Sequence, residues 1–449
     1  MSASPSTTLG PGLRRALLVS GLLIRILALP LTGTPDVDVW KTWSYAAAED
    51  VSTMYGVGGQ PPVRGVVRWG TRATTVNYPP AALYGLSLIG RVYRAFDPSF
   101  ADGAALTVTI KLTILFADAV IAWCLFALVR RWSSDAHLAA LFYWLNPGAI
   151  MNGAVLGYLD PWVGALAMAS IVALDRAWFG VGAMLMVLAA CTKPQGLLIV
   201  PVVPILLFYR AGGRAVRAAA IAGGAALLTL AVLFAPFARI GALANADQAI
   251  RSSLRHDMLS GQAANLWWIV TWVLRASYAA AEMGVWSAWT MTIRILAISR
   301  VIELGYPNPR VIGALMAGSL YVWAFWRARR AAPAVAIAAG ALAVHAYFTL
   351  EVQVHENHLH LALPLMAAAA VQLPRLRGPF YLVSTIVALN LLLFYGIGRP
   401  FPLPPRNFTV IDATVVLSFV NVAALVWHVR RFAAVTAVEK LEPRVSAVG

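Results

Sequence analysis

The chain has 449 residues, of which 60% are hydrophobic and only 12% are charged. Soluble domains carry roughly 25% charged residues, so this chain has too few charges to cover a soluble globule of its length. The high hydrophobicity excludes a disordered chain, and the presence of only 2 cysteines excludes a secreted disulfide framework. The composition therefore predicts a polytopic membrane protein.

The formal net charge is +16, from 35 basic and 19 acidic residues. A basic chain first suggests a nucleic-acid partner, but no recognised nucleic-acid-binding motif is visible. Lys and Arg collect in the cytoplasmic loops of membrane proteins, and this accounts for the excess. We therefore expect no nucleic-acid partner.

The first apolar run extends from Ala16 to Leu31 and follows Arg14 and Arg15. It resembles a signal peptide, but no convincing small-residue cleavage site follows it. We interpret it as an uncleaved first span whose N-terminus is cytoplasmic. Arg25 interrupts this span, and we favour an Arg that packs against other helices or snorkels over a ligand-binding one.

A membrane-spanning helix needs roughly 20 mostly apolar residues, and the hydropathy pattern predicts an all-α protein built from such helices. In chain order the candidate spans are 14–32, 104–129, 135–151, 159–175, 177–193, 196–209, 217–237, 310–326, 333–350, 359–374, 379–397 and 411–429. Two further apolar segments, 263–276 and 284–304, are interrupted by charged residues.

Clusters of basic residues predict which loops are cytoplasmic. They are Arg14/Arg15, Arg130/Arg131, Arg210/Arg214/Arg217, Arg327/Arg329/Arg330, Arg375/Arg377 and Arg430/Arg431. All of them lie inside only if 77–96 does not cross, and only if 263–276 and 284–304 both cross or neither does. The sequence thus predicts 12 or 14 spans with both termini inside, and we favour 14.

This topology predicts a single integral membrane domain over 1–449. Residues 33–103 form a long first external loop with juxtamembrane helices, and 432–449 form a cytoplasmic tail. The Ala-, Arg- and Val-rich composition is typical of a GC-rich bacterium, so we expect the cytoplasmic (inner) membrane. Several polar segments fall on the external side and are candidates for one shared site there.

Asp36 and Asp38 follow the first span and lie at the outer membrane surface. An aspartate there can act as a general base towards a lipid-linked substrate. It can equally cap the helix that begins nearby, and one residue can do each. Both alternatives stay open from the residues alone.

Two further external segments carry isolated charged residues. Asp160 opens a span, where the helix dipole stabilises an acid, although a contact with substrate is equally consistent. Lys193-Pro194-Gln195 lies at an outer helix boundary. A lone Lys in apolar surroundings is costly, so we favour a functional role, and an ammonium next to an amide suits a phosphate or a sugar hydroxyl. Tyr78, before Pro79 and Pro80, marks a helix start.

The segment His355-Glu356-Asn357-His358 lies at the outer end of another span. It does not match the HExxH zinc motif, so we expect no metal, and no cofactor motif occurs elsewhere. Phosphate binding by His355, in a protonated state that an acid orients, fits better. Arg255, in an outer loop before the tryptophan pair that begins at Trp267, fits either a lipid phosphate or simple headgroup contact.

Taken in order, these motifs resemble the GT-C superfamily of membrane glycosyltransferases, and in particular the dolichyl-phosphate-glucose-dependent glucosyltransferases. The matching segments are Asp36-Val37-Asp38 with Trp43, Tyr78-Pro79-Pro80, Ala264-Asn265-Leu266-Trp267 and Gln353-Val354-His355-Glu356. Asp160 and Lys193-Pro194-Gln195 look more like bacterial polyprenyl-phosphate-sugar mannosyltransferases. The family's Lys after His-Glu is replaced by Asn357, which leaves the donor sugar open.

The resemblance implies an inverting transfer of a hexose from a polyprenyl-phosphate donor to a lipid-linked or cell-envelope glycan acceptor. Asp36 would take the proton from the acceptor hydroxyl, and Asp38 would orient the base or the acceptor. Lys193, Gln195, His355, Glu356 and Arg255 would bind the donor phosphate and sugar. Tyr78, Asp160 and Trp267 would bind acceptor or support the site. Membrane lipids are the other expected partners.

A membrane transporter or lipid flippase is the alternative from a different class. It would share the spans and the buried charges. A transporter predicts polar residues spread through the middle of the spans, whereas the candidates here gather at one membrane face. The sequence therefore favours the enzyme.

Overall fold

A computed structural model of the chain describes residues 9–56, 65–399, 401–407 and 410–441. Helices make up most of these ranges. The only strands within them are β1 (Val66–Trp69) and β2 (Arg72–Thr75), which pair in an antiparallel hairpin. The fold is therefore all-α apart from this small surface feature.

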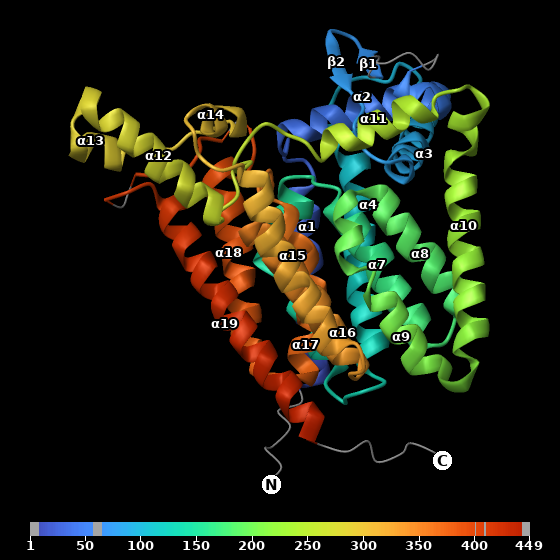
Figure 1. The fold of residues 1–449 in the computed structure, drawn as a ribbon. Coiled ribbons are helices and arrows are strands. Elements are labelled where there is room, and N and C mark those ends of the chain that lie inside the picture. Colours follow the sequence, from blue (N-terminus) through green and yellow to red (C-terminus); the bar gives the residue numbers. More distant parts are fainter. Residues whose placement is uncertain (1–8, 57–64, 400, 408–409, 442–449) are drawn as a thin grey trace.

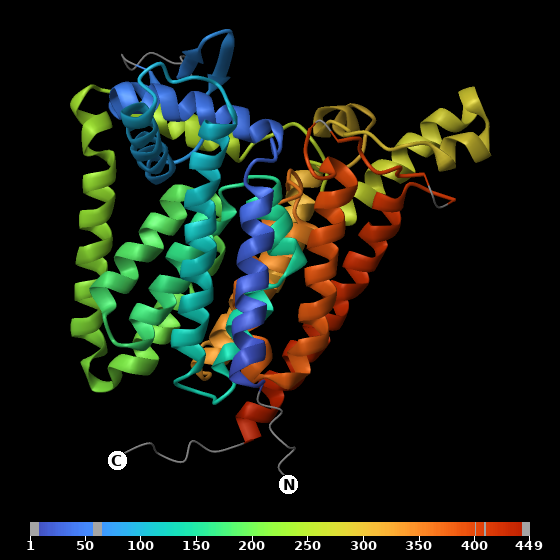
Figure 2. The same ribbon diagram turned by 180° about the vertical axis from the view of Figure 1, so that it is seen from behind.

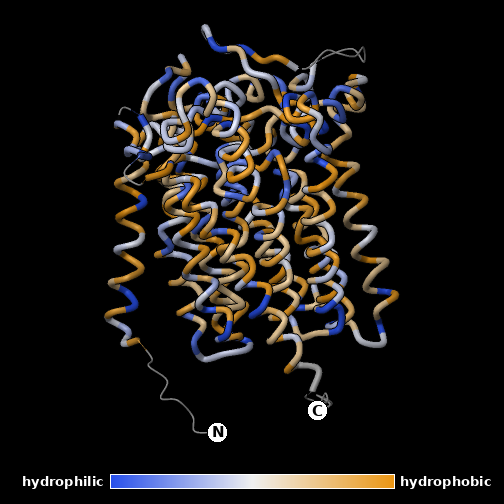
Figure 3. The backbone as a smooth tube through the Cα atoms, turned by 60° about the vertical axis from the view of Figure 1, so that its left-hand side comes forward, coloured by the Kyte–Doolittle hydropathy of each residue, from blue (hydrophilic) through white to orange (hydrophobic). Residues whose placement is uncertain are grey.

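The helices of a bundle run side by side between two ends of the molecule (Figure 1). They are α1 (Pro11–Ala28), α4 (Ala104–Val129), α5 (Ala136–Trp144), α7 (Asp160–Asp175), α8 (Phe179–Thr192), α9 (Val202–Ala211), α10 (Ala215–Arg239), α15 (Pro309–Ala328), α16 (Pro333–Leu350), α17 (Ala362–Gln372), α18 (Arg377–Tyr395) and α19 (Ala413–Leu441). By length and composition, 6 helical stretches in the described ranges can cross a membrane. Hydrophobic residues fill the middle of the bundle (Figure 3), as expected for a polytopic membrane protein.

The predicted span 135–151 is interrupted. Asn146 lies between α5 and the short α6 (Pro147–Ile150), and a π-helical turn, η2 (Met151–Val155), follows. The Asn146 side chain accepts from the backbone N–H groups of Gly148 and Ala149. Because Pro147 has no N–H to donate, the chain restarts a helix here instead of continuing one.

The segment 284–304 does not form a spanning helix, so our preference for 14 spans is wrong. It contains two short helices, α13 (Val285–Thr290) and α14 (Ile298–Glu303), with non-helical residues 291–297 between them. Helices of 6 residues are far too short to cross a bilayer. Together with α12 (Leu266–Met283) they lie at the same end as α2 (Figure 1).

Gly284 and Arg275 account for this interruption. Gly284 ends α12 with φ of 81°, a conformation that favours glycine. The Arg275 guanidinium donates to the carbonyl oxygens of Arg294, at 2.7 Å, and of Ile295. These bonds satisfy backbone groups that a helix would otherwise have paired.

Short helices cover one end of the bundle. They are α2 (Pro35–Asp50), α3 (Pro80–Phe96) and α11 (Leu243–Ser253), and the β1–β2 hairpin stands beside them (Figures 1 and 2). α2 and α3 approach closely at Gly90, where an added Cβ would lie 2.0 Å from the carbonyl oxygen of Ser44. Ser87 also donates to the carbonyl of Ala47 at 2.7 Å. This packing holds 77–96 at the end of the bundle.

The basic clusters lie at the opposite end. Arg130 follows α4, Arg210 lies in the last turn of α9 and Arg327 in that of α15. Both described chain ends are also at this end (Figure 1). The two ends of the bundle therefore differ in charge, as the sequence pattern predicted.

Arg25 is fully buried and packs between helices, as favoured from the sequence. Its Nε donates to Asp118 at 2.9 Å and its Nη1 to the Trp144 carbonyl at 2.6 Å. The Tyr143 hydroxyl donates to the other Asp118 oxygen at 2.6 Å. These bonds join α1, α4 and α5, and leave the charge paired inside the bundle.

Lys111 is a second buried cation, and no local pattern in the sequence singled it out. Its Nζ donates to the carbonyl oxygens of Leu31, Ala154 and Val155 at 2.6, 3.0 and 2.8 Å. These carbonyls end α1 and the π-helical turn, where intrahelical donors run out. The Lys111 ammonium group therefore has a structural role, because it binds backbone carbonyl oxygens that would otherwise be unpaired.

Candidate functional site

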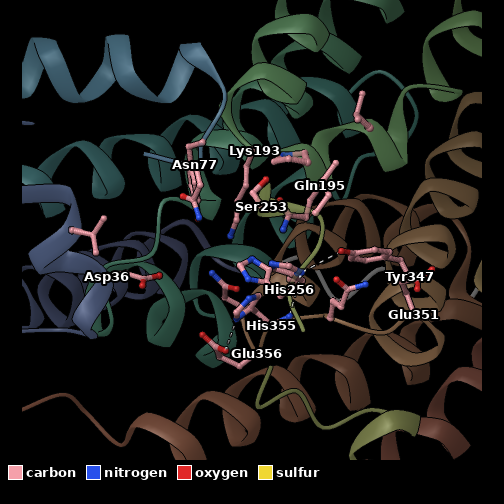
Figure 4. A pocket seen from close by; sticks show the side chains of 18 of the residues that line it. Asp36, Asn77, Lys193, Gln195, Ser253, His256, Tyr347, Glu351, His355 and Glu356 are labelled. Atoms are coloured by element: carbon pink, nitrogen blue, oxygen red, sulfur yellow. Dashed lines mark hydrogen bonds and ion pairs between the residues drawn. The ribbon is translucent and has the colours of Figure 1, made fainter. Parts of the chain in front are cut away.

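A cavity of about 760 Å³ is lined by residues of α2 and of the end of α11, among other segments. Its walls come from α2, the residues after β2, the 3₁₀ turn η3 (Pro194–Ile199), the end of α11, and the loop 351–357 that follows α16. Figure 4 shows side chains from these separate segments converging on it. The external segments singled out in the sequence therefore meet at one place.

Asp36 lies in the first turn of α2 and faces this cavity (Figure 4). It is half-buried, and no ion pair or hydrogen bond engages its carboxylate within the described ranges. Burial raises the pKa of Asp36, while the Lys193 charge lowers it and the Asp160 charge raises it. A free carboxylate of raised basicity at a cavity wall is suited to accept a proton.

Asp38 has different surroundings, although it is only two residues away. Its side chain is 42% exposed, lies 3.3 Å from Arg72, and is not part of the cavity wall. Residues i and i+2 point to different sides of a helix, so these two aspartates, which are close in sequence, have side chains in different surroundings. The expectation that Asp38 orients the base or acceptor finds no contact to support it.

Lys193 ends α8 and is only 4% exposed. Its Nζ lies 2.8 Å from Asp160, and Asn357 donates to the other Asp160 oxygen at 2.9 Å. Burial works to lower the pKa of Lys193, but the charge of Asp160 and its hydrogen bond, together with Tyr78 and Asp36, outweigh this, so the pKa lies above its ordinary value. Asp160 therefore begins α7 and also holds Lys193 charged at the cavity wall.

Glu356 is 4% exposed and accepts a hydrogen bond from the Tyr158 hydroxyl through Oε1. Its Oε2 has no hydrogen-bond partner among the described residues. Burial raises the pKa of Glu356 to about 8. The side chain is therefore a neutral carboxylic acid at pH 7, with one oxygen left to bond a ligand.

His355 lies beside Glu356, with Nδ1 3.8 Å from Glu356 Oε2. Its side chain is 36% exposed, and this exposure is to the cavity that it lines. Burial, followed by the charges of His256 and Lys193, lowers the pKa of His355 to about 3. This lowered pKa favours a neutral imidazole at neutral pH, whereas phosphate binding by a protonated His355 stays a prediction.

Other polar cavity residues were not among the candidate site residues, and they include the aromatic residues His256, Tyr347 and Tyr395. The ring of His256, after α11, lies 5.2 Å from that of His355. Tyr347 and Tyr395 also line the cavity, from the ends of α16 and α18. A tyrosine at the end of an apolar helix carries no local sign of function, because many such residues sit in membrane interfaces.

Gln195 and Tyr78 are in the cavity wall as expected. Gln195 is 8% exposed. In the described part of the chain its Oε1 atom has no hydrogen-bond partner, and neither has the Nε1 atom of Trp40 or of Trp43. The Tyr78 ring packs 5.1 Å from Trp40 and 5.5 Å from Trp43. Unpaired buried polar atoms around a cavity indicate that it binds a polar ligand.

Arg255 and Trp267 are not in the cavity wall. Arg255 is exposed, next to His256. Trp267 is buried and donates to the Leu350 carbonyl at 2.7 Å, while Asn265 caps α12 by accepting from Trp268 N–H at 3.0 Å. This motif anchors α12 against the end of α16, so Trp267 supports the site from outside.

His355, His358 and His360 are close in sequence, but their side chains do not converge on one place. His355 and His358 line the cavity, whereas His360 is buried next to Tyr143, 3.3 Å from its hydroxyl. In the described ranges no group of 3 or more His, Cys, Asp or Glu side chains is arranged to hold a metal ion.

No protein-family model matches the sequence, and no curated protein matches it significantly. The resemblance to GT-C glycosyltransferases therefore rests on the four sequence motifs alone. Three of the four motifs contribute side chains to the cavity, and the fourth anchors its wall.

Proposed function

We propose that the protein is an inverting glycosyltransferase of GT-C type. It would move a hexose from a polyprenyl-phosphate donor to a lipid-linked or glycan acceptor on the external membrane face. The observation that carries this proposal is that one cavity is lined by both the Asp36 carboxylate, which is unpaired among the described residues, and the buried Lys193, which pairs with Asp160 (Figure 4). A base and a cation in the same cavity suit a reaction that removes a proton and releases an anion.

Asp36 accepts the proton of the acceptor hydroxyl, whose oxygen attacks the anomeric carbon of the donor sugar. The bond from that carbon to the phosphate oxygen breaks, and polyprenyl phosphate leaves with the electron pair. Lys193 offsets the charge that grows on the phosphate, because its ammonium is already positioned and poorly solvated. Gln195 and His355 provide hydrogen bonds to the same group.

Three further observations support an enzyme over a transporter. The cavity is at one end of the helix bundle. The ionic side chains deep in the bundle bind protein: Arg25 pairs with Asp118, and Lys111 binds backbone carbonyls. A transport path would instead need polar groups that face an open route through the spans.

Asp36→Asn tests the proposal, and Asp38→Asn is its matched control on the same helix. The purified protein would be reconstituted in vesicles with radiolabelled glucosyl and mannosyl polyprenyl phosphates and membrane acceptors. We expect Asp36→Asn to lower the transfer rate at least about 100-fold, as for loss of a general base. Asp38→Asn should stay within a few-fold of wild type. Equal activity of Asp36→Asn and wild type would refute the assignment.

A further inference from the structure

A second cavity, of about 530 Å³, lies at the opposite end of the bundle. It is formed where α4, α9 and α17 end and where α16 begins. This is also the end that carries the basic clusters and both described chain ends (Figure 1). The transfer reaction proposed above makes no use of it.

Two arginines are oriented in this cavity by one carboxylate. The Asp175 side chain, 1% exposed, forms an ion pair with Arg131, whose Nε lies 2.7 Å from Oδ2, and its Oδ1 accepts from Arg210 Nε at 3.2 Å. The Arg131 side chain is 44% exposed and that of Arg210 27%, so both guanidinium groups also face outwards. Two cations against one anion leave a net positive charge, held on groups whose geometry matches a phosphate.

The cavity has a further donor that binds nothing in the described part of the chain. Gln372, in the last turn of α17, lines the cavity, and its buried Nε2 lacks a hydrogen-bond partner. Ala334, at the start of α16, adds a backbone N–H that has no acceptor within its own helix. All these groups are donors, so the ligand that fits them is an acceptor with negative charge.

Aromatic side chains indicate the source of that anion. Trp132 and Tyr209 line the cavity, and Tyr209 is 47% exposed. Phe208, its neighbour on α9, is 59% exposed. Trp and Tyr favour the boundary between lipid tails and headgroups, and exposed apolar side chains here are suited to acyl chains. We propose that this cavity binds the phosphate of an anionic membrane lipid.

Gln372→Leu is the sharpest test, because a structural role and a ligand role predict different results. It removes an unpaired buried amide, so the unliganded protein should be as stable as wild type or more so. Thermal unfolding of the full-length protein in neutral detergent would be followed while short-chain phosphatidylglycerol is added. We expect a saturable rise in Tm for wild type and an apparent Kd about tenfold weaker for Gln372→Leu, the effect of losing a hydrogen bond to a charged group.

Arg131→Gln should weaken binding at least as much. Arg217→Gln is the matched control, because Arg217 is an exposed basic residue in the first turns of α10 and does not line the cavity. Wild-type Kd for Gln372→Leu, or an equal loss for Arg217→Gln, would overturn the proposal, since general surface charge would then explain the binding.

Phosphatidylcholine and glycerol 1-phosphate complete the experiment. We expect phosphatidylcholine to bind more weakly, because its headgroup has no net charge, and glycerol 1-phosphate to bind more weakly because it lacks acyl chains. If glycerol 1-phosphate binds as tightly as phosphatidylglycerol, and Gln372→Leu weakens both, the site takes a soluble phosphate ester and the lipid assignment is wrong.

Discussion

Asp36 and Asp38 show how strongly a single helical turn separates two chemically identical residues. Asp36 faces a cavity and has no ion-pair partner among the described residues, whereas Asp38 lies 3.3 Å from Arg72. Arg72 in turn lies 2.6 Å from Asp102, which ties β2 to the loop before α4. Asp38 therefore belongs to a surface ion-pair network, which contributes little by itself to stability.

Glu356 gives the protein a pH dependence whose sign can be tested. Its pKa is 4.5 in the unfolded chain and about 8 in the folded protein. Between pH 4.5 and about pH 8 the folded state therefore binds more protons at this group than the unfolded state does. The contribution of this group to the free energy of unfolding is complete below about pH 4.5 and is lost as the pH rises through about 8. Glu356→Gln keeps the neutral amide throughout and should not show this loss.

The measurement compares the Tm of Glu356→Gln with that of wild type from pH 5 to pH 8.5. We expect the difference, variant minus wild type, to increase with pH. His355 acts in the opposite sense, since its pKa is lowered to about 3, but it is present in both proteins and cancels. A difference independent of pH would show that Glu356 is ionised at neutral pH in the folded protein.

At the scale of elements, the contact between α2 and α3 positions Asp36. Gly90 permits it, because a Cβ there would meet the Ser44 carbonyl oxygen at 2.0 Å. Neither backbone can yield without moving α2. The position of the proposed base therefore depends on a glycine in a different helix.

Gly90→Ala should destabilise the protein by about 1–3 kcal/mol, as overpacking of a tight contact does, and should lower transfer activity. Gly224→Ala is the matched control: Gly224 also lies within a helix, α10, but nothing lies within 4 Å of its added Cβ. The control should be neutral or more stable by about 0.5–1 kcal/mol. Chemical denaturation in detergent would measure both, and equal effects would contradict this account of the contact.

At the scale of the whole molecule, the interruption of 284–304 leads to a testable expectation for how the chain crosses the membrane. With α12, α13 and α14 at one end of the bundle, Glu282 lies on the same side as Asp50 at the end of α2 (Figure 1). A topology of 14 spans would place Glu282 on the opposite side, with the α9–α10 turn at Gly213. The two alternatives differ in one accessible position.

Single cysteines at 282, 50 and 213, each in a background lacking Cys124 and Cys191, would be labelled in sealed vesicles with a membrane-impermeant maleimide. All three native positions are exposed. We expect Glu282→Cys and Asp50→Cys to react from one side and Gly213→Cys only from the other. If Glu282→Cys reacted from the same side as Gly213→Cys, the result would support the 14-span topology.

The sequence by itself determined the membrane-spanning character, the end of the bundle that carries the arginine clusters and the motifs that gather around the larger cavity. These follow from local properties: hydropathy over about 20 residues sets a span, and a charge next to it selects a face. The helix start at Pro80 and the burial of Arg25 are of the same kind.

Only the tertiary structure decided which of the two aspartates faces the cavity, that Asp160 holds Lys193, and that Arg255 and Trp267 lie outside. It also brought in His256, Tyr347 and Tyr395, and paired Lys111 with backbone carbonyls. Each of these facts depends on contacts between residues far apart in the chain. Direction around a helix, the removal of water and the pairing of charges arise only when the elements pack, so the local sequence could not reveal them.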